Sequence, residues 1–256
     1  MIKIFDYNIF LIDKKIMNQY YQKQKSYFNK YAKTKNAIAT DTLADKCEWN
    51  QILETIGENT SDKNILDVGC GAGRIAIKFM MEGAHVTGID LSENLIELAN
   101  KNTEKVDKGS FKGKCENLLD MDEDHKYEYI LFVNVLHHTQ DSGNILAKAK
   151  RLLAINGKIL VIENNPLNPL FIIFFIIIGQ LKSHLTFNYL KSNIFSLRKL
   201  FLKENYSIIK INKYGYLPQS TYNINLIFFS LNRILNKIPL VNLFTAFHYI
   251  LLKNDN

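Results

Sequence analysis

Hydrophobic and polar positions follow two different patterns along the chain. Up to about residue 60 the spacing is helical and polar, which predicts a helix over 16–35 and a second over 41–59 that ends near Gly57. From residue 64 onward, short apolar runs alternate with amphipathic stretches. The runs predict strands at 64–69, 84–90, 110–115, 127–136 and 158–163, and the stretches predict helices at 73–83, 92–102 and 142–157.

This alternation of strands and helices indicates an α/β fold. Strands separated by helices form βαβ units, whose right-handed crossovers give a parallel, doubly wound sheet with helices on both faces. Ser92 is a suitable N-cap for the helix over 92–102. Gly83 and Gly157 are expected to end the helices over 73–83 and 142–157.

The first predicted strand runs into the sequence LDVGCGAGR, residues 66–74. In an open α/β sheet, ligands bind beyond the carboxyl ends of the strands, and glycines let the backbone approach a ligand closely. Asp67 precedes the glycines and would repel a phosphate, and Arg74 stands where a dinucleotide site has its third glycine. The turn therefore favours a ligand with an ammonium group over a dinucleotide.

A second carboxylate, Asp90, ends the next predicted strand. A carboxylate at this place accepts hydrogen bonds from the ribose hydroxyls of a nucleoside. The two aspartates together predict a nucleoside that carries an amino acid and no pyrophosphate. S-adenosylmethionine fits this description.

Composition changes this picture little. The chain has 256 residues, 47% hydrophobic and 22% charged, which is ordinary for a globular protein. Its net charge of +7 is compatible with a nucleic-acid or membrane partner, but the basic residues are scattered, as a general Lys, Asn and Ile bias would leave them. The three cysteines have no metal-ligand spacing and are expected to be free thiols in a reducing compartment. The N-terminus is a poor signal peptide, so we expect a cytoplasmic protein.

Five motifs in order resemble the class I S-adenosylmethionine-dependent methyltransferases, close to the ubiquinone and menaquinone branch. They are LDVGCGAGR (66–74), VTGIDLSENLIELA (86–99), CENLLDMD (115–122), YEYILFVNVLHHTQD (127–141) and LLAINGKILVIENNP (152–166). The resemblance implies a Rossmann-like, mostly parallel seven-stranded sheet whose last strand, at 247–253, is antiparallel. It also implies a helical cap over 1–60 and a methyltransferase domain over 61–256, with insertions at about 166–195 and 218–242.

The resemblance assigns the cofactor contacts residue by residue. The glycines would pack under the methionine part, Asp67 would meet its amino group, and Asp90 would hold the ribose. Leu91 would lie against the adenine. Lys114 stands where many members have an acid, and Glu116 is its candidate substitute. The expected cofactor residues are Asp67, Gly69, Gly71, Gly73, Asp90, Leu91, Cys115 (through its backbone N–H), Glu116 and Asn134.

His137 and His138 are the candidate catalytic residues. Methyl transfer to oxygen benefits from a base that takes the proton, and histidine is the usual one. Adjacent residues cannot both face the substrate, so we expect one of the two to be the base, with His138 ahead of His137. The alternative is that one or both only hydrogen-bond the loop backbone. Metal-dependent members carry a Glu-His cluster after the fifth strand, which is absent here, so we predict no metal.

In the family order the sixth strand would be YSIIKINKYGY (206–216). Two apolar segments, 170–178 and 224–235, follow the fifth and sixth strands and are expected over the active site. Both are too short to span a bilayer, which takes roughly 20 residues. Either they pack together as a lid, or they form an apolar mouth for a hydrophobic acceptor or a peripheral membrane contact. We predict O-methylation of a small hydrophobic, lipid-linked or sugar acceptor. The alternatives are a tRNA or other nucleic-acid methyltransferase, for which no clustered basic face is present, and a non-catalytic partner protein.

Overall fold

The computed structural model describes residues 19–34, 42–169, 173, 189–215 and 241–255. Apart from Ile173, the apolar segments 170–178 and 224–235 lie outside the described residues, as does most of the predicted insertion over 218–242. The predictions for these segments, and the division into a cap over 1–60 and a domain over 61–256, therefore stay predictions.

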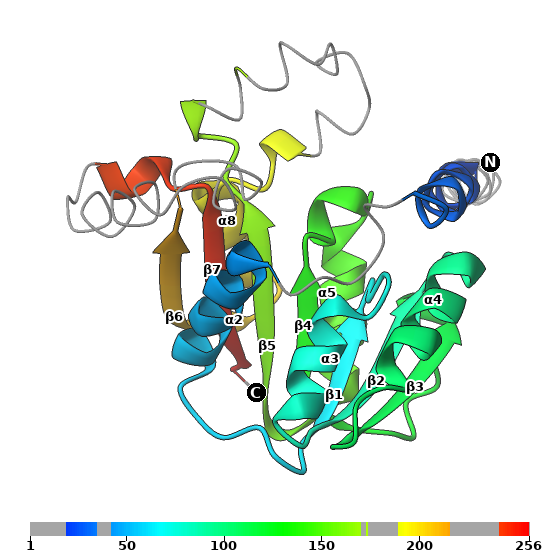
Figure 1. Ribbon diagram of the computed structural model, residues 1–256. Helices are drawn as coiled ribbons and strands as arrows, with labels where there is room; N and C mark the ends of the chain where they lie inside the picture. The colour runs from blue at the N-terminus through cyan, green and yellow to red at the C-terminus, as the bar shows by residue number, and fades with distance from the viewer. Residues whose placement is uncertain (1–18, 35–41, 170–172, 174–188, 216–240, 256) are drawn as a thin grey trace, which may run out of the picture.

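Seven strands form one sheet, as the sequence predicts (Figure 1). Their order is β3-β2-β1-β4-β5-β7-β6; all neighbouring pairs are parallel except those of β7, which runs antiparallel to both β5 and β6. The predicted doubly wound, mostly parallel fold with an antiparallel last strand is confirmed. The strands are β1 (Asn64–Val68), β2 (His85–Asp90), β3 (Ser110–Cys115), β4 (Tyr127–Val133), β5 (Leu153–Asn164), β6 (Tyr206–Tyr214) and β7 (Phe247–Asn254).

Helices cover both faces of the sheet (Figure 1). Helices α2 (Leu43–Ile56), α3 (Arg74–Met81) and α4 (Glu93–Thr103) lie on one face, and α5 (Ser142–Leu152) and α8 (Ile194–Lys203) lie on the other. Three short 3-10 turns lie between these elements: η2 (Leu118–Asp120), η3 (Leu136–His138) and η6 (Val241–Phe244). A further helix over residues 19–31 lies beside the carboxyl ends of β1 and β4.

The core is divided by the sheet into two layers. Along β5, Ile159 and Val161 pack with α5 and α8, whereas Leu160 and Ile162 pack with α2 and α3. All four side chains are fully buried. A strand buried on both faces shows a continuous apolar run rather than alternation, which is why this part of the chain is easy to recognise as a central strand.

The helix ends agree with the predictions except at one place. Gly57 ends α2 with φ +70°, and the Ser92 hydroxyl caps α4 by accepting a hydrogen bond from the Leu95 N–H. The helix predicted over 142–157 is wrong beyond Leu152, because Leu153 already takes extended backbone and begins β5.

Gly157 lies inside β5 rather than at the end of a helix. A Cβ atom on it would come within 2.9 Å of the Tyr127 carbonyl oxygen on β4. The preceding Asn156 has φ +61°, so the strand bends sharply here and its register with β4 shifts. The glycine is required by this close approach of two strands, a tertiary contact that produces the same sequence signal as a helix end.

Candidate active site

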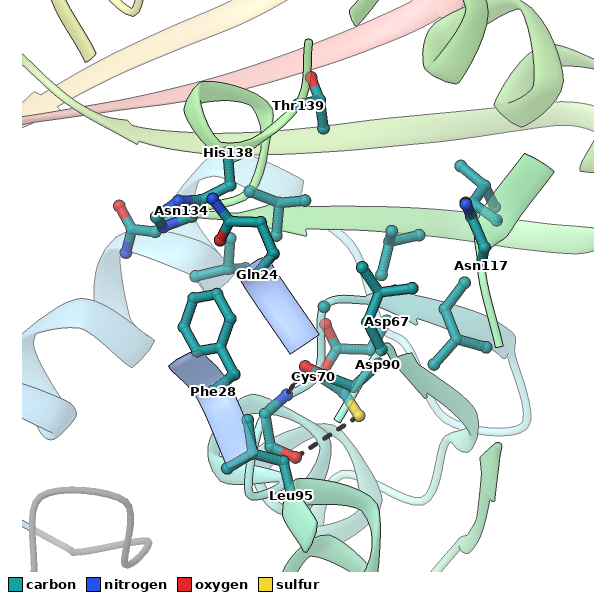
Figure 2. A pocket seen from close by; sticks show the side chains of 18 of the residues that line it. Gln24, Phe28, Asp67, Cys70, Asp90, Leu95, Asn117, Asn134, His138 and Thr139 are labelled. Atoms are coloured by element: carbon teal, nitrogen blue, oxygen red, sulfur yellow. Dashed lines mark hydrogen bonds between the residues drawn. The ribbon is translucent and has the colours of Figure 1, made fainter. Parts of the chain in front are cut away.

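A cavity of about 400 Å³ opens at the carboxyl ends of β1, β2 and β4 (Figure 2). Its walls come from the turn after β1, the end of β2, the residues before η2, the loop after β4 and the helix over 19–31. Eight of the eleven predicted site residues line it: Asp67, Gly69, Gly71, Asp90, Leu91, Glu116, Asn134 and His138. Gly73, Cys115 and His137 do not.

The turn after β1 has the backbone freedom expected from its glycines. Gly69 and Gly71 have φ +69° and +54°, a region that favours glycine. A Cβ atom on Gly71 would meet nothing within 4 Å, so the cavity continues up to the backbone at this residue. Gly73 instead caps α3 and lies under Ala99 of α4. Two glycines therefore shape the cavity, and the third joins two helices.

Asp90 is held in one orientation by backbone donors. The Gly71 N–H donates to its Oδ2 at 3.1 Å, and the Ser92 N–H donates to its Oδ1 at 2.9 Å. Burial raises the pKa of this carboxyl, and the backbone hydrogen bonds oppose the shift. The glycine turn and the second strand are thus joined through the carboxylate that the sequence assigns to the ribose.

Asp67 is buried without a full set of partners. Its side chain lines the cavity, although the residue is only 2% exposed. Its Oδ2 atom has no hydrogen-bond partner among the described residues. Burial raises the pKa of this carboxyl to about 7; Arg74 opposes the shift and Asp90 adds to it. An unpaired buried oxygen beside a cavity is costly unless a ligand supplies a donor.

The predicted adenine contacts are only partly brought together. Cys115 ends β3 beside Asp90, but its side chain is exposed and lies outside the cavity. Glu116 does line the cavity, donates its backbone N–H to the Asp90 carbonyl oxygen at 3.1 Å, and lies 3.7 Å from the Lys114 ammonium. The neighbouring Asn117 also lines it, and was not predicted.

Asn134 follows β4 in a left-handed conformation, with φ +57°. Its Oδ1 accepts a hydrogen bond from the Asn164 amide at 3.0 Å. Asparagine tolerates this conformation better than most residues. This backbone conformation places a polar side chain at the cavity wall, where Asn134 is expected to contact the cofactor.

The two histidines of η3 have different surroundings. His138 lines the cavity, its Nδ1 is buried with no partner in the described part of the chain, and burial followed by the nearby His137 lowers its pKa to about 3. The Nδ1 atom of His137 lies 2.6 Å from the Oε2 atom of Glu163, whose side chain is fully buried. The Oε1 atom of Glu163 accepts a hydrogen bond from the Leu136 N–H at 2.7 Å. Glu163 was not among the predicted site residues, so this pair was missed.

The helix over 19–31 forms one wall of the cavity, and none of its residues was among the predicted site residues. Tyr21, Gln24, Phe28 and Tyr31 line the cavity, and the Phe28 ring meets the His138 ring edge-on at 5.5 Å between centroids. Figure 2 shows Gln24 and Phe28 reaching toward the cavity from this helix. Their spacing of three, four and three residues puts them on one helical face, a signal that could have identified them.

The helix is fastened at both sides of the cavity. The Tyr20 hydroxyl donates to the His138 carbonyl oxygen at 2.9 Å. Lys25 pairs with Glu93 at 2.9 Å, and the Asn29 carboxamide oxygen accepts from the Ser92 hydroxyl at 2.6 Å, so the same helix also contacts the start of α4.

Comparison with known proteins agrees with this arrangement. The family model described as "Methyltransferase domain" matches residues 59–220, more than half of the chain, so the chain belongs to that family. The predicted resemblance to class I methyltransferases is confirmed at the level of family and fold.

Curated relatives and solved structures extend the match. The chain is 31% identical over 98 residues to a ubiquinone biosynthesis O-methyltransferase of Coxiella burnetii strain RSA 493, and 28% identical over 127 residues to one of Nitrosomonas europaea. These alignments cover 38% and 48% of this chain and only 42% and 54% of the relatives. A magnesium protoporphyrin IX methyltransferase from Synechocystis PCC 6803, crystallised with bound SAH, shares the fold at TM-score 0.64 and 14% identity, covering 92% of this chain and all of its own.

Two predictions concern a metal ion and the membrane. Within it, no cluster of three or more histidine, cysteine, aspartate or glutamate side chains is arranged to hold a metal ion. No helix in the described ranges has the length and apolar character needed to cross a bilayer. The absence of a metal and the cytoplasmic location stay predictions.

Proposed function

We propose that this protein transfers a methyl group from S-adenosylmethionine to an oxygen atom of a small hydrophobic, lipid-linked or sugar acceptor. The observation that carries the proposal is the pair of buried aspartates at one cavity: Asp90 is fixed by two backbone N–H groups, and Asp67 has an unpaired oxygen. The oxygen acceptor is supported by the curated relatives, whose names describe them as O-methyltransferases of ubiquinone biosynthesis.

The residues present fit this cofactor. The cavity reaches the backbone at Gly71, where the methionine part would lie, and Asp67 beside it offers an acceptor to a cationic amino group. Asp90 would accept hydrogen bonds from the ribose hydroxyls, with Leu91 and Glu116 on the side of the base. Cys115 would contribute through its backbone alone, because its side chain lies outside the cavity.

When bound, the cofactor supplies the methyl group of its sulfonium, and the sulfur that loses this group becomes a neutral thioether. The chain's own part is to position both reactants and to take the proton of an acceptor hydroxyl. Glu163 holds His137 through Nδ1, which leaves the lone pair of the opposite ring nitrogen available to accept a proton. His138 stays neutral because its pKa is about 3, which makes it a poor base. We therefore propose His137 with Glu163 as the base for an acceptor hydroxyl that approaches η3 from outside the cavity lining, and His138 as a wall of the cavity.

The proposal is tested by calorimetry followed by product analysis. S-adenosylmethionine and S-adenosylhomocysteine should bind the wild type, and Asp67→Asn and Asp90→Ala should weaken both. Methyl-labelled cofactor is then incubated with a phenol, a polyprenylated phenol, a hexose and bulk tRNA. Label on the oxygen of a phenol or hexose supports the proposal. Label on tRNA alone, or no cofactor binding by a folded wild type, would refute it.

A further inference from the structure

Helix α8 buries one side and exposes two large apolar residues on the other. Ile194, Leu197 and Phe201 pack into the core, whereas Phe195 is 61% and Leu202 is 68% exposed. Phe195 and Leu202 are seven residues apart, so they lie one above the other on the same outer face. Leu190, just before the helix, is 52% exposed.

The same outer face is strongly basic. Arg198 and Lys199 lie between Phe195 and Leu202 at helical spacing and are exposed, and Lys191 is exposed beside Leu190. The ten residues of α8 include no aspartate or glutamate. We call the set Leu190, Lys191, Phe195, Arg198, Lys199 and Leu202 the α8 face.

This face is held rigidly, although its side chains are not needed by the core. The Asn193 side chain caps the helix by accepting the N–H groups of Phe195 and Ser196 at 3.1 and 3.0 Å. The buried side anchors α8 to the sheet beside β6. Residues of the face can therefore be replaced without loss of packing, which makes them suitable for a binding test.

We propose that the α8 face docks on an anionic lipid surface. Apolar side chains interleaved with lysine and arginine are the pattern of a helix that lies in the membrane interface, where the apolar groups enter the headgroup region and the cations meet anionic lipids. A nucleic acid would use the cations but not Leu202 or Leu190. A symmetric pair of copies would bring Arg198 and Lys199 against their own kind, which is repulsive.

The inference does not rest on the proposed methyl transfer, because docking is measured without cofactor or acceptor. Wild-type protein is floated with vesicles of phosphatidylcholine, and with vesicles that also contain phosphatidylglycerol. Binding to the anionic vesicles is expected, with little binding to the neutral ones. The variant R198Q/K199Q should bind about 30-fold more weakly, since each basic residue near an anionic surface contributes about fivefold.

A second variant, F195S/L202S, separates lipid from other partners. It should reduce flotation by tenfold or more and keep the wild-type melting temperature, because both side chains are exposed. A matched control, M81S/I155S, removes two apolar side chains that are 54% and 94% exposed outside this face, and K101Q/K105Q removes two exposed charges outside α8. Both controls should float like the wild type.

Three outcomes would overturn the proposal. The first is a wild type that ignores anionic vesicles. The second is F195S/L202S floating like the wild type while R198Q/K199Q does not, together with salt-sensitive tRNA binding, which would assign the face to nucleic acid. The third is concentration-dependent self-association that F195S/L202S abolishes, which would assign it to a second copy of this chain.

Discussion

Affinity for the cofactor should depend on pH through Asp67. Its carboxyl titrates at about 7 in the free protein because it is buried, yet it must be ionised to accept a cationic amino group. Affinity should therefore be highest well above pH 7 and fall as pH drops through the pKa. With a pKa of about 7, the ionised fraction falls about 25-fold between about pH 7.5 and about pH 5.5, and the association constant should fall with it.

The assay is calorimetric titration with S-adenosylhomocysteine, which carries the same amino group and does not react. Asp67→Asn keeps the shape of the side chain and removes its charge. At about pH 7.5 it should lose roughly 1.5–3 kcal/mol of binding free energy, the range for hydrogen bonds to charged groups. Over the same pH range its affinity should change little.

The same carboxyl has the opposite effect on folding. Its pKa lies at 3.8 in a solvated reference and about 7 in the folded protein, so the folded state binds more protons between these values. The free energy of unfolding of the free protein should therefore fall as pH rises from about 4 to about 7, by up to about 4 kcal/mol. Asp67→Asn should melt at a higher temperature than the wild type at pH 8. A wild type with equal affinity at both pH values, or an Asn variant that keeps the wild-type pH dependence, would refute the reasoning.

Further variants test the rest of the site. Asp90→Ala should weaken binding of the same ligand by roughly 1.5–3 kcal/mol, and unchanged affinity in the calorimeter would remove its role. Once an acceptor is found, Glu163→Gln and His137→Ala should each lower kcat by about 10²-fold with cofactor affinity kept; a loss of kcat seen only in His138→Ala would reverse the assignment. Phe28→Ala should weaken cofactor binding by roughly 1 kcal/mol. Tyr27 is an exposed neighbour of Phe28, and Tyr27→Ala, tested in parallel, should leave cofactor binding unchanged.

The sequence predicted those parts of the fold and site that depend on local pattern. Buried strands gave continuous apolar runs, and the acids Asp67 and Asp90 came directly after such runs, so the sheet edge placed them together. Gly157 was misjudged because a glycine required by a neighbouring strand resembles one that ends a helix. The pair of His137 and Glu163 joins η3 to β5, two elements that are distant along the chain, and no local pattern marks it.

The wall formed by residues 19–31 was missed as part of the site for a related reason. A helical pattern with aromatic residues on one face predicts that the helix packs against something, but not what it packs against. Its contact runs from Tyr20 to His138, which are far apart along the chain. Only the folded sheet brings them together.

That wall also bears on how fast the enzyme turns over. We expect a nucleoside bound beneath the helix to leave when the helix releases its hold on the His138 carbonyl and on the start of α4. The residence time of the spent cofactor would then depend on the opening rate of this helix as well as on contacts to the nucleoside. Steady-state turnover under saturating acceptor would then report the opening of the helix. A burst of product in the first cycle would show that this release step, and not methyl transfer, limits the rate.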